Sequence, residues 1–140
     1  MTGSPEAQRR RNSDAVRLMF DCERRKDIDT WVSLWHPDGR QSFPWTDAVI
    51  AGRDTLRSIV QQKFATRSDI VIHDQVFALE DPAQVFAVVA VSMRVEGIVD
   101  PVETTIWCRF LFDEKGLIVE QQEAFDTAYA ARAFKDEASA

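Results

Sequence analysis

The stretch LWHPDGRQSFPW, which runs from Leu34 to Trp45, decides how this chain can fold. Pro37 ends any helix that precedes it, because the residue before a proline is pushed out of the α region and the ring clashes with the preceding turn. The Asp-Gly pair that follows is typical of a tight turn. From Gln41 onward, Gln, Phe and Trp alternate with smaller residues, and this period of two favours a short strand with one aromatic face. We therefore predict a helix, a turn and then the first strand of a sheet.

Apolar residues at helical spacing predict three helices around this stretch. The first is expected from Asn12 or Ser13, either of which can cap it, to about Arg25. Asp27 can cap the second helix, which ends at the turn. The third opens just before Asp54, a residue that is favourable at the positive end of the helix dipole. Its buried stripe is expected to be Leu56, Ile59, Val60, Lys63 and Phe64, with the lysine snorkelling to water.

The second half of the chain is rich in the β-branched and aromatic residues that favour strands. Strands are expected over 70–79, 85–96, 102–112 and 117–125. The short turn-like breaks before the last two strands predict antiparallel hairpins. An Ala-rich stretch at 127–134 is expected to form a short final helix. Helices followed by a four- or five-stranded antiparallel sheet form an α+β pattern, in which the helices pack on one face of a curved sheet.

The 140 residues of the chain are most simply a single domain. Residues 1–11 contain almost nothing to bury, so we predict a flexible N-terminal tail there. The folded domain is expected over 12–134, followed by a C-terminal tail over 135–140.

The composition narrows the choice of partners and compartment. A formal charge of -6 repels phosphate backbones and anionic membranes, so neither nucleic acid nor a membrane is expected as a partner. The two cysteines, Cys22 and Cys108, form no CxxC pair and are expected to be buried thiols in a reducing interior. The chain has no apolar run long enough to span a bilayer and no signal segment at its start, so the cytoplasm is the expected location.

Most catalytic motifs are missing from the sequence. His36 and His73 are the only histidines, and no metal-ligand spacing accompanies them, so no metal is expected. The five glycines are scattered singly and form no phosphate loop, and no serine lies in a nucleophile elbow. The chemistry that remains is acid/base catalysis in an apolar pocket, without a cofactor.

Glu123 is the first candidate for that chemistry. If the turn before the last strand is tight, one face of the hairpin carries Leu117, Val119, Gln121, Glu123 and Phe125 together with Ile106, Cys108 and Phe110. Glu123 is then the one carboxylate on an apolar face, with Gln121 as its polar neighbour. Burial disfavours the charged form, which raises the pKa towards the range of a general base or acid. The alternative is a register shifted by one residue, which turns Glu123 towards water or a subunit interface.

Two further residues are candidate partners of Glu123. Asp47 lies just past the aromatic strand and is a possible second carboxylate, although such a residue is also a common turn former. His36 lies at the end of the second helix, where the helix C-terminus alone favours an imidazolium. His73 falls on a strand whose buried face the sequence leaves open.

Large aromatic residues cluster near the opening stretch. Trp31, Trp35, Phe43 and Trp45 are compatible with an ordinary core, but four such rings around one turn also suit a pocket for a flat or ring-shaped molecule. On the other face of the sheet we expect Trp107, Arg109 and Leu111. An outer face with these residues predicts a covering second subunit, and therefore a homodimer.

The order of these motifs resembles a known family. A helix, the LWHPDGR turn, an aromatic strand, AGRDTL at a helix start and a meander ending in GLIVEQQEAFDT are similar to the SnoaL-like branch of the nuclear transport factor 2-like superfamily, over residues 13–134. GRDTL, the Asp81–Pro82 turn and GLIVEQQE are most similar to the phenazine-biosynthesis A/B proteins. The resemblance implies a cone of curved sheet and three helices around a deep pocket, usually dimeric through the sheet.

The same resemblance implies roles for individual residues. The glutamate of the last strand works in that family as an acid/base group on a cyclic ketone precursor, and it maps onto Glu123. An aspartate after the tryptophan strand maps onto Asp47. The family's histidine on the third helix corresponds here to Ile59, which implies a cavity reshaped for another substrate. The residues expected to line that cavity are Trp31, Trp35, Phe43, Trp45, Ile59, Gln121 and Phe125.

Two functions are compatible with these residues. The first is an isomerase, dehydratase or cyclase that acts on a hydrophobic cyclic ketone or enol, with Glu123 as base or acid and Asp47 or His36 as its partner. The second is a module of the same fold that binds a small hydrophobic molecule, or assembles with another subunit, without turnover. The titration of Glu123 distinguishes the two, because only the first needs a raised pKa.

Overall fold

The computed structural model describes residues 3–126 and residue 128. Its elements, in chain order, are α1 (Pro5–Arg25), α2 (Ile28–Ser33), β1 (Trp35–Ser42), β2 (Val49–Ala51), α3 (Arg53–Thr66), β3 (Arg67–Ala78), β4 (Gln84–Val95), β5 (Val102–Phe112) and β6 (Ile118–Phe125).

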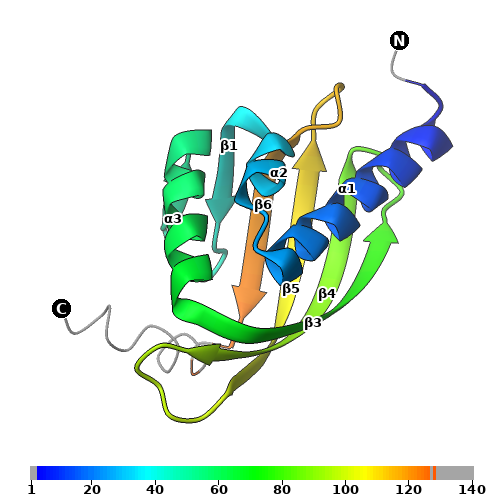
Figure 1. Cartoon of the computed structure of the whole chain (residues 1–140). Coiled ribbons are helices and arrows are strands. Elements are labelled where there is room, and N and C mark those ends of the chain that lie inside the picture. Colours follow the sequence, from blue (N-terminus) through cyan, green and yellow to red (C-terminus); the bar gives the residue numbers. More distant parts are fainter. Residues whose placement is uncertain (1–2, 127, 129–140) are drawn as a thin grey trace.

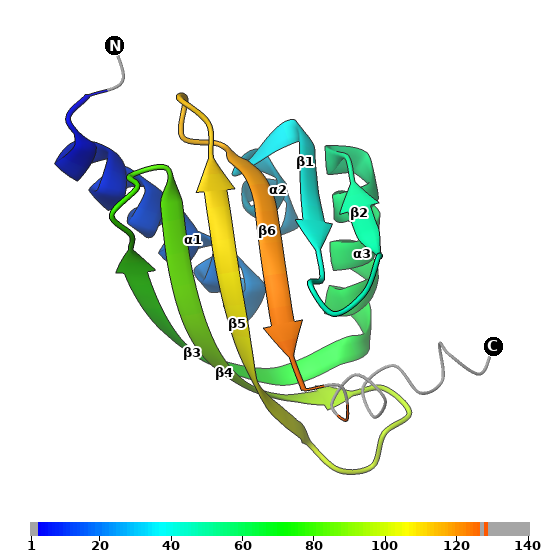
Figure 2. The ribbon, with the colours of Figure 1, turned by 180° about the vertical axis from the view of Figure 1, so that it is seen from behind.

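The described elements form two layers, with the three helices against one face of a curved, unclosed sheet (Figure 1). The view from behind shows the other face, over which none of these helices lies (Figure 2). The predicted α+β class is therefore confirmed. None of the described helices is long and apolar enough to cross a membrane.

The sheet contains six strands within the described residues, in the order β2-β1-β6-β5-β4-β3. The strands from β3 to β6 pair antiparallel with their neighbours, as the short connections predict. The prediction of four or five antiparallel strands is incomplete, because β1 adds to β6 in parallel and β2 adds to β1. The whole meander separates β1 from β6 in sequence, so no local pattern signals this pairing.

The first strand begins earlier than the opening stretch indicated. α2 ends at Ser33, β1 starts at Trp35, and Pro37 lies inside the strand rather than before it. The pairing with β6 is irregular between Trp35 and Arg40, which accommodates the proline because its missing N–H removes a ladder donor there. The strand also ends at Ser42, so the predicted aromatic strand up to Trp45 is wrong in its second half.

Glycine is required at position 39, within this irregularity, because there is no room for a side chain. The backbone dihedral angles of Gly39 do not themselves demand glycine. A Cβ atom at Gly39 would lie 2.8 Å from Cε3 of Trp35 and 3.0 Å from the carbonyl oxygen of Ile118. These contacts are shorter than carbon atoms normally tolerate. Only a residue without a side chain lets β1 pass so close to the buried indole of Trp35.

The first helix also begins earlier than predicted, at Pro5 instead of Asn12 or Ser13. Ser4 caps it by accepting a hydrogen bond from the backbone N–H of Ala7, and proline suits the first helical position because its missing donor is not needed there. Residues 5–11 are thus helical, not a tail. The predicted final helix at 127–134 and the tail at 135–140 lie outside the described residues, apart from residue 128.

The core lies between the helices and the concave face of the sheet. Trp35 and Phe110 are fully buried, and Phe20 of α1 packs edge-on against Phe110 with ring centroids 6.3 Å apart. Both cysteines are buried free thiols, as predicted. The predicted shared face of the hairpin is confirmed for six residues, which form three cross-strand pairs: Ile106 with Phe125, Cys108 with Glu123 and Phe110 with Gln121.

The register differs at the start of β6. A shift between Leu111 and Phe112 puts Ile118 on the core face with no exposed surface, in place of Leu117 and Val119. One extra residue in a strand reverses the face of everything on one side of it. The predicted core face is therefore right for Gln121, Glu123 and Phe125, which follow the irregularity, and wrong for Leu117 and Val119.

Candidate active site

A cavity of about 360 Å³ opens between α3, the end of β1 and the core face of β5 and β6. Three aromatic side chains border it, from Trp31, Phe43 and Phe125. Its aliphatic wall is formed by Ile50, Ile59, Val60 and Ile106. Its polar groups come from Glu23, Gln41, Gln62, Lys63, Arg67, Gln121 and Glu123. We call this space the outer chamber.

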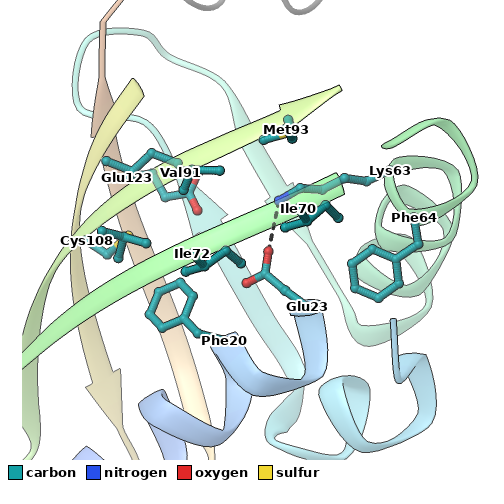
Figure 3. A pocket seen from close by; sticks show the side chains of 12 residues that line it. Phe20, Glu23, Lys63, Phe64, Ile70, Ile72, Val91, Met93, Cys108 and Glu123 are labelled. Carbon is teal, nitrogen blue, oxygen red and sulfur yellow. Dashed lines mark hydrogen bonds and ion pairs between the residues drawn. The ribbon is translucent and has the colours of Figure 1, made fainter. Parts of the chain in front are cut away.

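A second, smaller space of about 40 Å³ lies deeper between α1 and the sheet (Figure 3). Apart from the residues that it shares with the outer chamber, it is lined by Cys108 and by apolar side chains of α1, α3, β3 and β4. These side chains are Phe20, Phe64, Ile70, Ile72, Val89, Val91 and Met93. We call this space the inner chamber. Both chambers are bordered by Glu23, Lys63, Ile106 and Glu123.

Glu123 lies on β6, on the wall that the two chambers share. Burial is the main influence on this carboxyl group and raises its pKa from 4.5 to about 7. The positive charge of Lys63 opposes this shift, and the negative charge of Glu23 adds to it. A carboxyl group with a pKa near neutrality can both accept and donate a proton at physiological pH.

A row of side-chain amides orients Glu123. Nε2 of Gln41 on β1 donates to Oε1 of Gln121 at 2.9 Å, and Nε2 of Gln121 donates to Oε1 of Glu123 at 2.8 Å. Nε2 of Gln121 also lies 3.6 Å from the sulfur of Cys108. Since the oxygen of Gln121 is occupied by Gln41, its NH₂ group must face the carboxylate. The parallel pairing of β1 with β6 places Gln41 opposite Gln121 and so builds this row.

Cys108 is the cross-strand neighbour of Glu123 and also borders the inner chamber. Burial raises the pKa of its thiol well above the ordinary value, and the neighbouring negative charge of Glu123 adds to the effect. A thiol that stays protonated is a poor nucleophile. Cys108 is therefore a buried packing residue and not a candidate for covalent catalysis.

Opposite Glu123, an ion pair joins two helices (Figure 3). Nζ of Lys63 on α3 lies 3.0 Å from Oε1 of Glu23 on α1. The side chain of Glu23 is 11% exposed and that of Lys63 is 38% exposed. Lys63 therefore does not simply snorkel to water, as its place in an apolar stripe predicted, because a buried carboxylate holds its ammonium group beside the chambers.

The structure brings together most of the predicted cavity residues. Trp31, Phe43, Ile59, Gln121 and Phe125 border the outer chamber with Glu123.

Two tryptophans of the predicted wall do not border either chamber. Trp35 is buried in the core beside Trp31, with ring centroids 5.4 Å apart. Trp45 is 46% exposed and packs against Phe43 and Phe125 at the rim.

The two predicted partners of Glu123 lie elsewhere. Asp47 is exposed in the loop between β1 and β2, because β1 ends earlier than predicted and leaves the residues after Ser42 outside the sheet. His36 lies near the start of β1, where its Nδ1 accepts a hydrogen bond from the backbone N–H of Asp38. Neither residue borders a chamber that contains Glu123.

Glu23 and the role of Lys63 were not predicted from the sequence. A signal for Glu23 existed, because it follows Val16, Met19 and Phe20 on the buried face of α1 at helical spacing. A buried carboxylate on an apolar helix face needs a partner of opposite charge. Lys63, on the apolar face of α3, could have been identified as that partner.

Gln41 was predicted only as the start of an aromatic strand, and its amide is the donor to Gln121. This role depends on the pairing of β1 with β6, so the sequence offered no local signal for it. Within the described residues, no group of three or more metal-ligating side chains exists.

The match to a family model agrees with this geometry. The model of the SnoaL-like domain family matches residues 16–121. The chain belongs to the SnoaL-like domain family. Its fold is accordingly that of the nuclear transport factor 2-like proteins, which include a structural neighbour from Burkholderia xenovorans. A search of curated protein sequences gave no significant match.

Several solved structures share the architecture of this SnoaL-like domain. The phenazine biosynthesis-related protein PhzB2 of Pseudomonas aeruginosa is 20% identical, with a TM-score of 0.76 over 94% of this chain and 89% of that protein. The epoxide hydrolase/cyclase-like enzyme SalBIII, of pyran ring formation in salinomycin, is 19% identical, with a TM-score of 0.73 over 91% of this chain and 96% of SalBIII. Rv0760c of Mycobacterium tuberculosis, in complex with estradiol-17β-hemisuccinate, is 14% identical, with a TM-score of 0.68 over 78% of this chain and 88% of that protein. At these identities the comparisons establish the fold.

Proposed function

We propose that this SnoaL-like domain is a small-molecule enzyme that uses Glu123 as a general base and acid, without a cofactor, on a hydrophobic cyclic ketone or enol. The reaction is an isomerisation, a dehydration or a cyclisation. The observation that carries the proposal is the position of Glu123, whose pKa is raised to about 7, on the wall of a cavity with aromatic and aliphatic side chains.

The hydrogen bond from Gln121 distinguishes the two oxygens of Glu123. Oε1 accepts the amide of Gln121, and this bond is compatible with both the charged and the neutral carboxyl group. In the described part of the chain, Oε2 accepts no hydrogen bond. Oε2 is therefore the atom that exchanges a proton with a ligand.

The proton transfer needs no cofactor. Oε2 of Glu123 removes a proton from the carbon next to a carbonyl group, and the C–H electron pair moves into the carbonyl to give an enolate. The ammonium of Lys63 lies on the same wall and favours the negative charge that forms. The neutral Glu123 then returns its proton. If the enolate is conjugated with a C=C bond, the proton goes to the far carbon of that bond, and the double bond shifts. If the β carbon carries a hydroxyl group, the proton goes to that oxygen, the C–O bond breaks, water leaves and a new C=C bond forms.

The lining of the outer chamber supports a ring-shaped ligand. Trp31, Phe43 and Phe125 offer flat apolar surface, and the cavity of about 360 Å³ is large enough for a small ring compound. The structural neighbours point the same way, because SalBIII acts in pyran ring formation and Rv0760c was solved with a steroid derivative.

The test uses 2-tetralone, a ring ketone fused to a flat benzene ring, whose protons next to the carbonyl exchange with solvent through the enol. In D₂O, NMR should show exchange that is faster with the protein than with buffer. Glu123→Gln should lower the accelerated rate at least about 100-fold while the Kd for 2-tetralone changes little. Asp47→Asn, at the exposed loop position, is the matched control and should keep the wild-type rate. Equal rates for wild type and Glu123→Gln would reject Glu123 as the base and leave a binding module.

We also propose that the uncovered face of the sheet forms a homodimer. Trp107 is 57% exposed there, and Phe77 and Val71 are each 49% exposed on the same face. Arg109 and Leu111 continue this face along β5. An apolar sheet face of this kind is typically covered by another chain in an assembly.

A further inference from the structure

We propose that the inner chamber is a binding subsite for a short alkyl group, so that the preferred ligand is a ring ketone with an alkyl substituent on the carbon next to its carbonyl. Only one part of this inference rests on the proposed function, namely that the carbonyl group of the ligand lies beside Glu123. The existence of the alkyl subsite is a property of binding and is tested separately from turnover.

The first step is the arrangement of the two chambers. Each is bordered by the same polar wall, formed by Glu123, Lys63 and Glu23. A ligand oxygen that meets these groups therefore has the outer chamber on one side and the inner chamber on the other. Three aromatic side chains, those of Trp31, Phe43 and Phe125, border the outer chamber, and two, those of Phe20 and Phe64, border the inner one.

The second step is the chemistry of the inner chamber. Away from the shared wall, the side chains that border it are apolar except for the thiol of Cys108, and Val89 and Met93 among them are 1% and 3% exposed. Because a charged or hydrogen-bonding substituent would lose its water here without a partner, such groups are excluded. An apolar substituent gains free energy from the same burial.

The third step is size. A cavity needs roughly 10–15 Å³ for one water-sized group, and the inner chamber measures about 40 Å³. It therefore accepts about three heavy atoms. A ring cannot enter, whereas a methyl, ethyl or propyl group can. The outer chamber, at about 360 Å³, must hold the ring.

These steps place the parts of a ligand in order. The ring lies against Phe43 and Phe125, the carbonyl and the acidic carbon lie beside Glu123, and the alkyl group points between α1 and the sheet. A 2-tetralone with an alkyl group on the carbon between its carbonyl and its aromatic ring has this arrangement. That carbon also carries the most acidic proton of the molecule, which Glu123 would remove.

The experiment measures the Kd of 2-tetralones that carry hydrogen, methyl, ethyl, propyl or hexyl on this carbon, by quenching of tryptophan fluorescence. Trp31 borders the outer chamber and supplies the signal. Each added carbon up to propyl should tighten binding about three- to fourfold, and hexyl should bind more weakly than propyl. A Kd that is independent of chain length, or that keeps falling to hexyl, would overturn the proposal.

Variants locate the effect. Ile70 borders only the inner chamber and is partly buried, so Ile70→Ala should move the preference to a longer chain and Ile70→Phe should remove the gain from the alkyl group. Ile50, also partly buried, borders only the outer chamber. Ile50→Ala is the matched control and should weaken the whole series by a similar factor. A shift of the preferred length in Ile50→Ala and not in Ile70→Ala would place the alkyl group elsewhere and reject the subsite.

The same series in Glu123→Gln separates this inference from the proposed function. If wild type and Glu123→Gln both keep the chain-length preference in Kd, but wild type does not accelerate exchange over buffer, the subsite stands and the catalytic proposal falls. If wild type accelerates exchange and Glu123→Gln does not, but the Kd is independent of alkyl chain length, the catalytic proposal stands and the subsite falls.

Discussion

Nζ of Lys63 on α3 lies 3.0 Å from Oε1 of Glu23 on α1, and this pair borders both chambers together with Glu123. The positive charge of Lys63 lowers the pKa of Glu123 and the negative charge of Glu23 raises it. The two helices thus adjust the proton affinity of a group on the sheet. Because each charge of the pair can be removed by a separate substitution, its effect on the pKa of Glu123 can be measured separately.

Removing these charges should move the pKa of Glu123 in opposite directions. Lys63→Met removes the charge that favours the carboxylate, so the pKa should rise above about 7. Glu23→Gln removes the charge that disfavours it, so the pKa should fall. Both values can be read from NMR titration of the ¹³C-labelled carboxyl group, with the Glu123→Gln spectrum identifying the signal. Shifts in the same direction in both variants would contradict the electrostatic coupling.

The raised pKa of Glu123 should appear in the pH dependence of stability. Between pH 4.5 and about 7 the folded protein keeps a proton on Glu123 that the unfolded chain releases, so this group makes the free energy of unfolding fall as pH rises. Since one pKa unit corresponds to about 1.4 kcal/mol, the loss is on the order of 3 kcal/mol when pH reaches 8. Glu123→Gln lacks this titration. Urea unfolding at pH 5 and pH 8 should therefore show wild type losing more stability than the variant, and parallel losses would rule out a raised pKa.

The amide row should contribute to the rate through orientation. Gln41→Leu removes the donor to Gln121, so the amide of Gln121 can rotate and present its oxygen to Glu123 instead of its NH₂ group. Loss of one such hydrogen bond is worth about 0.5–1.5 kcal/mol, which predicts a kcat for exchange about 2- to 10-fold lower. Gln62→Leu is the matched control, because Gln62 also borders the outer chamber but is not part of the row. Equal effects of the two variants would mean that Gln41 acts only through the shape of the cavity.

Gly39 should tolerate no side chain. In Gly39→Ala the new Cβ meets the ring of Trp35 and two backbone oxygens, so we expect a loss of about 1–3 kcal/mol in the free energy of unfolding. The exposed neighbouring residue provides a control, since Asp38→Ala should change stability by less than about 0.5 kcal/mol. Chemical denaturation measures both, and a neutral Gly39→Ala would show that β1 can move away from the core.

The proposed homodimer should depend on the uncovered sheet face. Trp107→Glu puts a charge at the centre of that face and should give a monomer by light scattering coupled to size-exclusion chromatography. Trp45→Glu changes a tryptophan that is also exposed, at 46%, but lies at the rim of the outer chamber, so its mass should equal that of wild type. A monomeric wild type, or a Trp107→Glu variant that remains dimeric, would reject this interface.

Much of the fold follows from local patterns in the sequence. The β5–β6 register was predicted on the condition of a tight turn between the strands, with a shift of one residue as the alternative, because such a shift would reverse every side chain. That register places Glu123 beside Cys108 and Gln121 beside Phe110. The early helix start was missed because Ser4 and Pro5 act through capping geometry, while the apolar spacing on which the prediction relied begins later.

The sequence by itself determined the α+β class and the strands of the meander, because these depend on neighbours along the chain. It left two faces open for Glu123, and the β5–β6 register of the structure selects the core face. Only the tertiary structure decided which groups surround that carboxylate. Glu23 and Lys63 act on it from α1 and α3, and Gln41 on β1 acts on it through Gln121, while Asp47 and His36 do neither. The physical reason is that distances between separate elements depend on how helices dock on the curved sheet and on the parallel pairing of β1 with β6. No local pattern in the chain encodes that pairing or that docking.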